Sequence, residues 1–353
     1  ISEIKLFSFG YTNARELARK IVACLRLSSE QLSSQDHYDF GMRNVTAILN
    51  AAGALKQRYP NVPEDALCRR AIADCNIPKF TSQDIPLFRF ITRDLFPGVN
   101  QKATAHDALQ QAIINSIGAL GLQAVPSFVT KCMELYDTFC VRHGLMLVGA
   151  PWSGKSRSLR VLAHALSSLA GTDSFAKVDT YFLNPKAIEM DQLYSAENAT
   201  THEWTDGVLP TIMIACEQDP SPNWKWIVFD GPVDAKWIES MNTVLDDTKK
   251  LFLGSGAVIR LKKFMSMVFE VEDLRYASPA TVSRCGMVFM EPRSLGWQPL
   301  VDSWIASLPK NVQDFVPEIR KLIAWLVPPC LEFVARHTKD QIPMSDIGRV
   351  VNL

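Results

Sequence analysis

The sequence has no excess of charge of either sign: 37 Lys and Arg residues balance 37 Asp and Glu residues, for a formal net charge of zero. A nucleic-acid-binding domain typically carries a basic excess, so this balance argues against nucleic acid as a partner. No apolar run approaches the roughly 20 residues that span a bilayer, so we expect no membrane partner. Internal repeats of the solenoid type and low-complexity tracts are also absent from the sequence.

Metal-binding and disulfide patterns are equally lacking. The eight cysteines include no CxxC pair, and the six histidines include no HxxxH spacing. We therefore expect reduced cysteines buried in the core of a cytosolic protein, and no zinc site. The first residues, Ile-Ser-Glu-Ile, show neither an initiator Met nor a signal-peptide pattern. We expect the sequence to be a segment of a longer protein.

The 353 residues, 47% hydrophobic and 21% charged, are enough for two or three globular domains. Apolar residues at helical spacing predict helices over residues 1–80. Residues 84–103 contain Pro86, Pro97 and Gly98 and are interpreted as a connector. Two further helices are expected near 104–120 and 126–142.

The pattern then changes to short apolar runs alternating with helices. The candidate strands are 145–148, 178–183, 226–229, 251–253 and 265–269. Continuous apolar strands separated by helices are typical of a parallel sheet covered on both faces. We therefore predict an α/β fold with helical parts on either side, the second beginning at Trp297.

Residues 149–156, Gly-Ala-Pro-Trp-Ser-Gly-Lys-Ser, match the P-loop pattern G-x-x-x-x-G-K-[ST] at every fixed position. The glycines let backbone N–H groups turn inward around an anion, and the following helix adds its positive dipole end. The lysine can reach the β- and γ-phosphates and the last serine can ligate Mg²⁺. A chance strand–turn–helix is the alternative. The candidate nucleotide-binding residues are Gly149, Pro151, Ser153, Gly154, Lys155 and Ser156.

Asp230 ends the apolar run 226–229, in the form of a Walker B strand whose Asp supports Mg²⁺. The alternative is an ordinary aspartate at a strand end. Gly231 stands where many ring ATPases place the glutamate that polarises the attacking water, and glycine cannot act as a base. General-base assistance is worth about 10²–10⁴-fold, so we expect ATP (or ADP) to be held with Mg²⁺ and to persist. Asp234 and Glu239 are the nearest substitutes.

Two arginines are candidates for action on a neighbouring site. Arg284 follows 278–283 and precedes the final strand, where ring ATPases carry an arginine finger. Arg43 lies at the start of a helix in the N-terminal part. Taken alone, a surface salt-bridge partner and a solvated helix charge are the alternatives for these two residues.

Five stretches carry a resemblance that covers nearly the whole chain: 33–43, 94–98, 202–207, 229–247 and 277–286. They resemble the dynein heavy chain, the AAA+ motor of microtubules. The residue sequence at 33–39 looks more like that of the axonemal dyneins of cilia and flagella than that of cytoplasmic dyneins. The resemblance implies that 1–95 is the helical lid of the first AAA+ module. It further implies that 96–295 is the α/β core of the second module and that 296–353 begins that module's own lid.

The resemblance also implies roles. Arg43 matches the lid arginine that senses nucleotide in the first module, and Arg284 matches the arginine finger directed at that same site. Lys155, Ser156 and Asp230 match the second module's own site, which in this family binds ATP without turning it over. The implied partners are the other AAA+ modules, and microtubules, intermediate chains and light chains through regions outside this sequence.

One departure and three rival functions stay open. The wider AAA+ pattern commonly places Asn at the end of the strand 265–269, where this sequence has Glu270. A hydrolytically active module using Asp234 or Glu270 as base is the main rival. A P-loop phosphotransferase and a scaffold with a dead site are the others.

Overall fold

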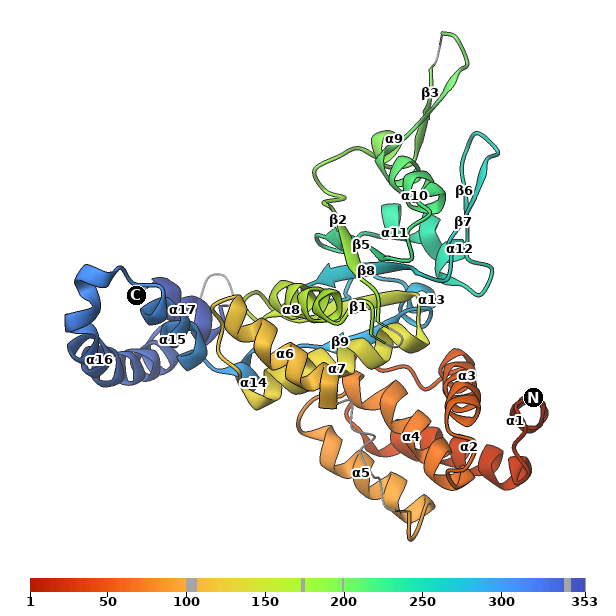
Figure 1. The fold of residues 1–353 in the computed structure, drawn as a ribbon, viewed down its shortest axis with the longest axis horizontal. Helices are drawn as coiled ribbons and strands as arrows, with labels where there is room; N and C mark the ends of the chain where they lie inside the picture. The colour runs from red at the N-terminus through yellow and green to blue at the C-terminus, as the bar shows by residue number, and fades with distance from the viewer. Residues whose placement is uncertain (100–106, 173–174, 199, 340–343, 353) are drawn as a thin grey trace.

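The computed structural model describes residues 1–99, 107–172, 175–198, 200–339 and 344–352. The N-terminal part is helical, as predicted (Figure 1). Its core gathers apolar side chains that are fully or almost fully buried, such as Leu17, Ile48 and Phe88. The helices are α1 (Ser2–Ser8), α2 (Ala14–Gln31), α3 (Met42–Arg58), α4 (Glu64–Asn76) and α5 (Asp84–Leu95), with a 3-10 turn at Ile77–Lys79.

The predicted connector over 84–103 is wrong for its first half, because α5 occupies 84–95. Pro86 does not break this helix, since it lies in the first turn, where the missing N–H would have no intrahelical partner. Phe88, completely buried, anchors α5 to the helical core. Residues 100–103 of that prediction, and 104–106 of the next predicted helix, lie outside the described residues.

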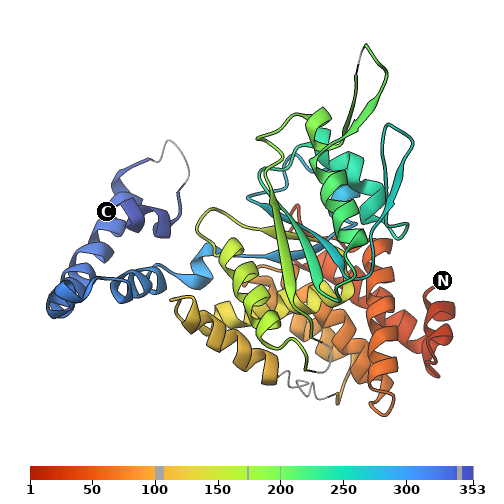
Figure 2. The ribbon, with the colours of Figure 1, turned by 45° about the horizontal axis from the view of Figure 1, so that its top comes forward.

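Five parallel strands form the central sheet in the order β2-β5-β8-β1-β9. Figure 2 shows helices on both sides of these strands. The predicted α/β fold, a parallel sheet flanked by helices, is therefore confirmed. The strands are β1 (Gly144–Val148), β2 (Val178–Leu183), β5 (Trp224–Asp230), β8 (Met265–Val271) and β9 (Gly286–Phe289).

Successive side chains of β1, inside the sheet, enter two different cores. Leu145 and Leu147 of β1 pack with α6 (Asp107–Ala119), α7 (Pro126–Val141) and α8 (Lys155–Ser168). Met146 and Val148 pack on the opposite face, with α10 (Val208–Gln218) and its neighbours. Because side chains alternate between the faces of a strand and both faces are covered, the strand has to be apolar throughout.

The predicted strand at 251–253 does not join the central sheet. Instead β6 (Lys250–Phe252) pairs antiparallel with β7 (Val258–Arg260). Leu251 is the one buried residue of β6, so this short strand has a single buried face and fits the half-exposed position of a hairpin. A second hairpin joins β3 (Ser195–Glu197) and β4 (Trp204–Asp206).

Short helices complete this part and place its loops. They are α9 (Met190–Leu193), α11 (Ala235–Ile238), α12 (Asn242–Leu245) and α13 (Pro279–Val282), with a 3-10 turn at Glu239–Met241.

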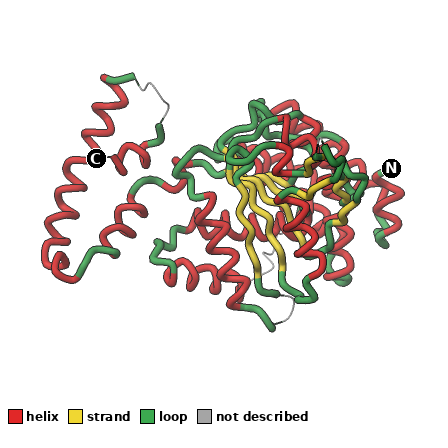
Figure 3. Tube along the Cα trace, turned by 90° about the horizontal axis from the view of Figure 1, so that it is seen from above, coloured by secondary structure: helices red, strands yellow, loops and turns green. Residues whose placement is uncertain are grey.

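The C-terminal part is helical, as predicted, and lies on the opposite side of the sheet from the N-terminus (Figure 3). Its last helix returns to the P-loop: a Cβ on Gly348 would lie 3.3 Å from Trp152 Cδ1. Within the described ranges, no helix is both long enough and apolar enough to span a membrane. The elements are α14 (Pro292–Leu295), α15 (Gln298–Ala306), a 3-10 helix (Lys310–Phe315), α16 (Val316–His337) and α17 (Asp346–Asn352).

Candidate nucleotide site and arginine cluster

The P-loop leaves the end of β1 as a tight turn that opens α8. The backbone N–H of Gly149 donates to the carbonyl of Val271 at 3.1 Å, and that of Ser153 to the carbonyl of Ala150 at 3.3 Å. A side chain at 149 would overlap the Met290 carbonyl oxygen, so glycine is required there. Gly154 caps α8 at φ 89, a conformation that favours glycine. The turn is therefore shaped to present backbone N–H groups and the start of a helix.

Lys155 and Ser156 form the first residues of α8. The Lys155 Nζ donates to the carbonyl oxygens of Gly149 and Ala150, the latter at 3.1 Å. Burial lowers the pKa of Lys155, and the acidic groups nearby, led by Glu270, oppose this. The Ser156 hydroxyl donates to Glu270 Oε2. Both side chains thus lie at the position where a triphosphate and its metal ion bind in P-loop proteins.

Two carboxylates face this turn from neighbouring strands. Asp230 is the last residue of β5, and its partner in the parallel ladder is Glu270 of β8. The strand β8 continues to Val271, so Glu270 lies inside the strand and not at its end. Burial raises the pKa of Glu270; the hydrogen bond from Ser156 opposes this, and the charge of Asp230 adds to it. The carboxylate of Asp230 and the hydroxyl of Ser156 could hold Mg²⁺, since both are hard oxygen ligands.

The residue after Asp230 carries no side chain that could orient water. Asp234, a candidate base, accepts from Lys186 Nζ at 2.8 Å and from the backbone N–H of Lys236 at 3.0 Å, which caps α11. The hydrogen bond from Lys186 keeps the pKa of Asp234 below its ordinary value. Glu239 is exposed in a 3-10 turn. These contacts assign Asp234 to helix capping and an ion pair.

A cavity of about 800 Å³ opens beside the P-loop and is also lined by Asp230, Gly231 and Glu270. Its volume is within the range of ligand pockets, roughly 300–1,000 Å³. The apolar part of its wall comes from α7, α14, α15, α17 and the loop after α6. Its main members are Leu122, Phe128, Leu295, Trp304 and Ile347. Polar groups at one end and apolar groups at the other suit a nucleotide, which has a charged tail and a flat aromatic base.

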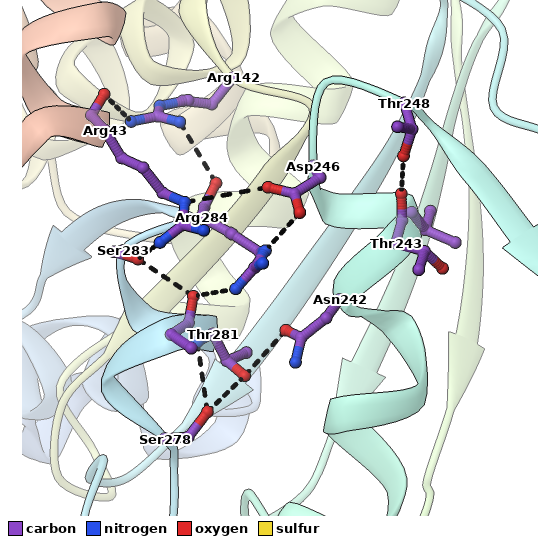
Figure 4. Close-up of polar contacts among 12 residues, drawn as sticks. Arg43, Arg142, Asn242, Thr243, Asp246, Thr248, Ser278, Thr281, Ser283 and Arg284 are labelled. Atoms are coloured by element: carbon purple, nitrogen blue, oxygen red, sulfur yellow. Dashed lines mark hydrogen bonds and ion pairs between the residues drawn. The ribbon is translucent and has the colours of Figure 1, made fainter.

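The second cluster brings together two arginines from distant parts of the chain (Figure 4). Arg43, in α3, donates to the hydroxyl of Ser283, 240 residues further along, at 3.0 Å. Arg284 follows α13 and donates to the carbonyl of Ala280 at 2.7 Å. Asp246, which ends α12, lies 3.9 Å from Arg43 Nε and 2.9 Å from Arg284 Nε. The Arg284 contact is an ion pair without hydrogen-bond geometry.

Arg142 and a ring stack join the same two parts of the chain. From the end of α7, the Arg142 guanidinium donates to the carbonyl of Arg284 at 3.3 Å and to that of Arg43 at 3.5 Å. His37 stacks on Phe289 of β9 with ring centroids 4.5 Å apart. The start of α3 is therefore held against the loop that carries Arg284. Among the described residues, neither Arg43 nor Arg284 lines the P-loop cavity.

Sequence reasoning missed the contacts of three of these residues. Asp246 stands inside the resembling stretch 229–247, but nothing in its spacing indicates that it faces Arg43 and Arg284. Arg142 gave no signal beyond its place at a helix end. The sequence did not indicate which group Glu270 contacts; in the structure its partner is the hydroxyl of Ser156.

The chain matches two family models. Residues 1–156 match "Hydrolytic ATP binding site of dynein motor region", and residues 144–285 match "AAA domain (dynein-related subfamily)". It is 47% identical to dynein axonemal heavy chain 1 of Rattus norvegicus over 100% of its length, and 48% identical to dynein axonemal heavy chain 3 of Mus musculus over 98%. It is 49% identical to dynein axonemal heavy chain 12 of Homo sapiens over 94%. The chain spans 8%, 9% and 11% of these three relatives, respectively.

Proposed function

This chain belongs to the dynein heavy chain family, and from that premise we propose that it is a nucleotide-holding part of the motor ring. Residues 1–95 would be the lid of the first AAA+ module, 96–295 the core of the second, and 296–353 the start of the second lid. In support, the helical core of α1 to α5 and the two cores of the sheet are separate clusters.

The second module binds ATP with Mg²⁺ and hydrolyses it little. Lys155 and the backbone N–H groups at the start of α8, those of Ser153 and Gly154 among them, hold the phosphates, and Gly149 and Pro151 shape the turn around them. Ser156 and Asp230 hold the Mg²⁺, which neutralises phosphate charge when bound. The observation that carries this proposal is the complete P-loop beside Asp230 and Gly231, at a cavity of nucleotide size.

The contacts of the rival bases favour holding over hydrolysis. Asp234 is occupied by Lys186 and by the start of α11. Glu270 contacts Ser156, the proposed metal ligand, so it lies on the metal side of the site. A base has to reach the attacking water within about 2.6–3.2 Å. Asp234 is held by its own partners, and the hydrogen bond that Glu270 accepts ties it to Ser156.

Arg43 and Arg284 act on the first module's nucleotide, not on the one at Lys155. Their convergence supports this proposal, since guanidinium groups from the proposed first lid and second core lie at one place (Figure 4). Neither group belongs to the lining of the P-loop cavity. Arg284 is the arginine finger that stabilises the negative charge on the phosphoryl group being transferred. Arg43 is the arginine of the lid that senses the nucleotide.

We propose that the whole protein acts as a motor in the axoneme of a cilium or flagellum, because its relatives are named axonemal heavy chains. The neighbouring AAA+ modules of the same heavy chain are the direct partners of this segment. Microtubules, intermediate chains and light chains bind through other regions of the heavy chain.

The test is to identify the nucleotide whose binding requires Lys155. The full-length heavy chain and its Lys155→Ala variant are purified and denatured, and the released nucleotides are separated by chromatography. We expect the variant to lack one equivalent of ATP per chain. Lys131→Ala is the matched control, because Lys131 pairs with Glu134 on α7. If the missing nucleotide is ADP that exchanges with added ATP by turnover, the holding function is wrong.

A further inference from the structure

The carboxylate of Glu270 is buried with half of its hydrogen-bonding capacity unused. The residue is 4% exposed, its Oε2 accepts from Ser156, and its Oε1 has no hydrogen-bond partner among the described residues. A buried carboxylate oxygen without a partner is costly, because water solvates it well in the unfolded chain. Glu270 also lines the cavity beside the P-loop. An unpaired carboxylate oxygen that lines a cavity is suited to bind a ligand there.

The charges around Glu270 point to a cation as that ligand. Asp230 is its ladder partner, and adjacent strands lie about 4.8 Å apart, so two carboxylates stand side by side at the P-loop. Lys155 and Arg160 supply positive charge near Glu270, but the Lys155 ammonium donates to the carbonyl oxygens of Gly149 and Ala150. A hard divalent cation is bound by carboxylate and hydroxyl oxygens, which Asp230, Glu270 and Ser156 supply.

We propose that Glu270 is a metal-holding residue of this site, so that with Asp230 and Ser156 it binds a divalent cation before the nucleotide arrives. The inference deepens the proposed nucleotide-holding function and rests on it. A P-loop site with one carboxylate depends on the phosphates to retain Mg²⁺, since Mg²⁺ is usually held by one or two carboxylates plus phosphate oxygens. A second carboxylate reduces that dependence. The preloaded cation then strengthens the hold on ATP and slows its release.

The competing account of the same contact is a structural tie, in which Glu270 accepts from Ser156 only to fix β8 against the start of α8. The two accounts differ in one observable, which is cation binding without nucleotide. A structural tie predicts no loss of bound cation when the charge of Glu270 is removed while its shape is kept.

The experiment counts Mn²⁺ bound to the full-length heavy chain by electron paramagnetic resonance, after nucleotide has been stripped with apyrase and a chelator. Glu270→Gln is compared with the wild type. Glu272→Gln is the matched control, because Glu272 lines the same cavity two residues along and is exposed. Thermal unfolding with and without Mn²⁺ provides a second measurement and verifies that each variant is folded.

We expect Glu270→Gln to bind one Mn²⁺ more weakly than the wild type by at least roughly 10–100-fold, which is the range for loss of a group that only orients a metal ligand. The Mn²⁺-dependent rise in Tm should shrink with it, and Glu272→Gln should match the wild type. Equal Mn²⁺ binding by Glu270→Gln and wild type overturns the inference. That result leaves the nucleotide-holding function standing if ATP still depends on Lys155, whereas loss of that dependence overturns the proposed function itself.

Discussion

Replacing Arg284 with alanine separates the proposed finger role from a purely structural one. The Arg284 side chain is 14% exposed and contacts the Ala280 carbonyl and the Asp246 carboxylate. If these contacts are its whole purpose, Arg284→Ala costs only local stability. If Arg284 stabilises phosphate charge in the first module, the variant costs turnover there.

The two costs differ widely in size. One hydrogen bond is worth about 1 kcal/mol, and an ion pair with Asp246, which is 38% exposed, adds about 0.2–1 kcal/mol because solvent screens it. The structural loss is therefore roughly 1–2 kcal/mol. An arginine finger is worth about 10³–10⁵ in rate, which equals about 4–7 kcal/mol at 1.36 kcal/mol per tenfold change.

The assay is steady-state ATP turnover by the full-length heavy chain, with the ATP retained at Lys155 as a second readout. Arg284→Ala should lower turnover by about 10³-fold or more and leave the retained ATP in place. Arg275→Ala is the control, because Arg275 also lies in the α/β part and pairs with Asp273 at the surface. A loss smaller than about 30-fold, or an equal loss in Arg275→Ala, would refute the finger role; the limit of about 30-fold corresponds to the upper structural cost of about 2 kcal/mol.

Two further changes test the absent base and an ion pair of the N-terminal helices. Gly231→Glu should convert the ATP at Lys155 to ADP, with turnover rising by up to about 10²–10⁴-fold; a Cβ there lies 3.1 Å from Asn184 Oδ1, so a small shift admits it. Gly231→Ala makes the same contact without a carboxylate, and persistent ATP in the glutamate variant would contradict the reasoning. Glu64→Gln should lower the free energy of unfolding by roughly 2 kcal/mol at pH 7. Burial acts to raise the pKa of Glu64, but hydrogen bonds from the backbone N–H groups of Asn13 and Thr12 and from Lys56 lower it to about 2. Because this folded-state pKa lies below the unfolded value of about 4.3, the stabilisation is complete above that pH and is lost as the pH falls toward 2. Urea unfolding at pH 7 and pH 3 measures the difference; a constant difference would count against the ionised form as its source.

Local pattern was enough to predict the secondary structure around the candidate nucleotide site. The P-loop and Asp230 were predicted correctly as parts of a strand–turn–helix and of a strand end, because their spacing is set by the backbone of a few adjacent residues. The parallel sheet followed from continuous apolar runs, since burial on both faces leaves no polar position. The resemblance to the dynein heavy chain family covered nearly the whole chain, and the comparisons confirm that family.

Local pattern failed where packing decides. The run at 251–253 has strand composition, yet it pairs with β7 and not with the sheet. Residues 84–95 contain a proline, yet α5 forms, because the proline lies in its first turn and Phe88 is buried against the other helices. Both outcomes depend on which distant surface is available to cover an apolar side chain.

From the sequence alone came the identity of the groups: a P-loop lysine, a strand-ending aspartate, a glycine in place of a base, and two arginines matched by resemblance. The tertiary structure decided which of them meet. It placed Arg43 and Arg284 on the two oxygens of Asp246, and it set Glu270 against Ser156 with one oxygen unpaired. Spacing along the chain determines contacts within a turn, a helix or a strand, whereas contacts between distant segments are determined by the packing of the helices and strands that carry them.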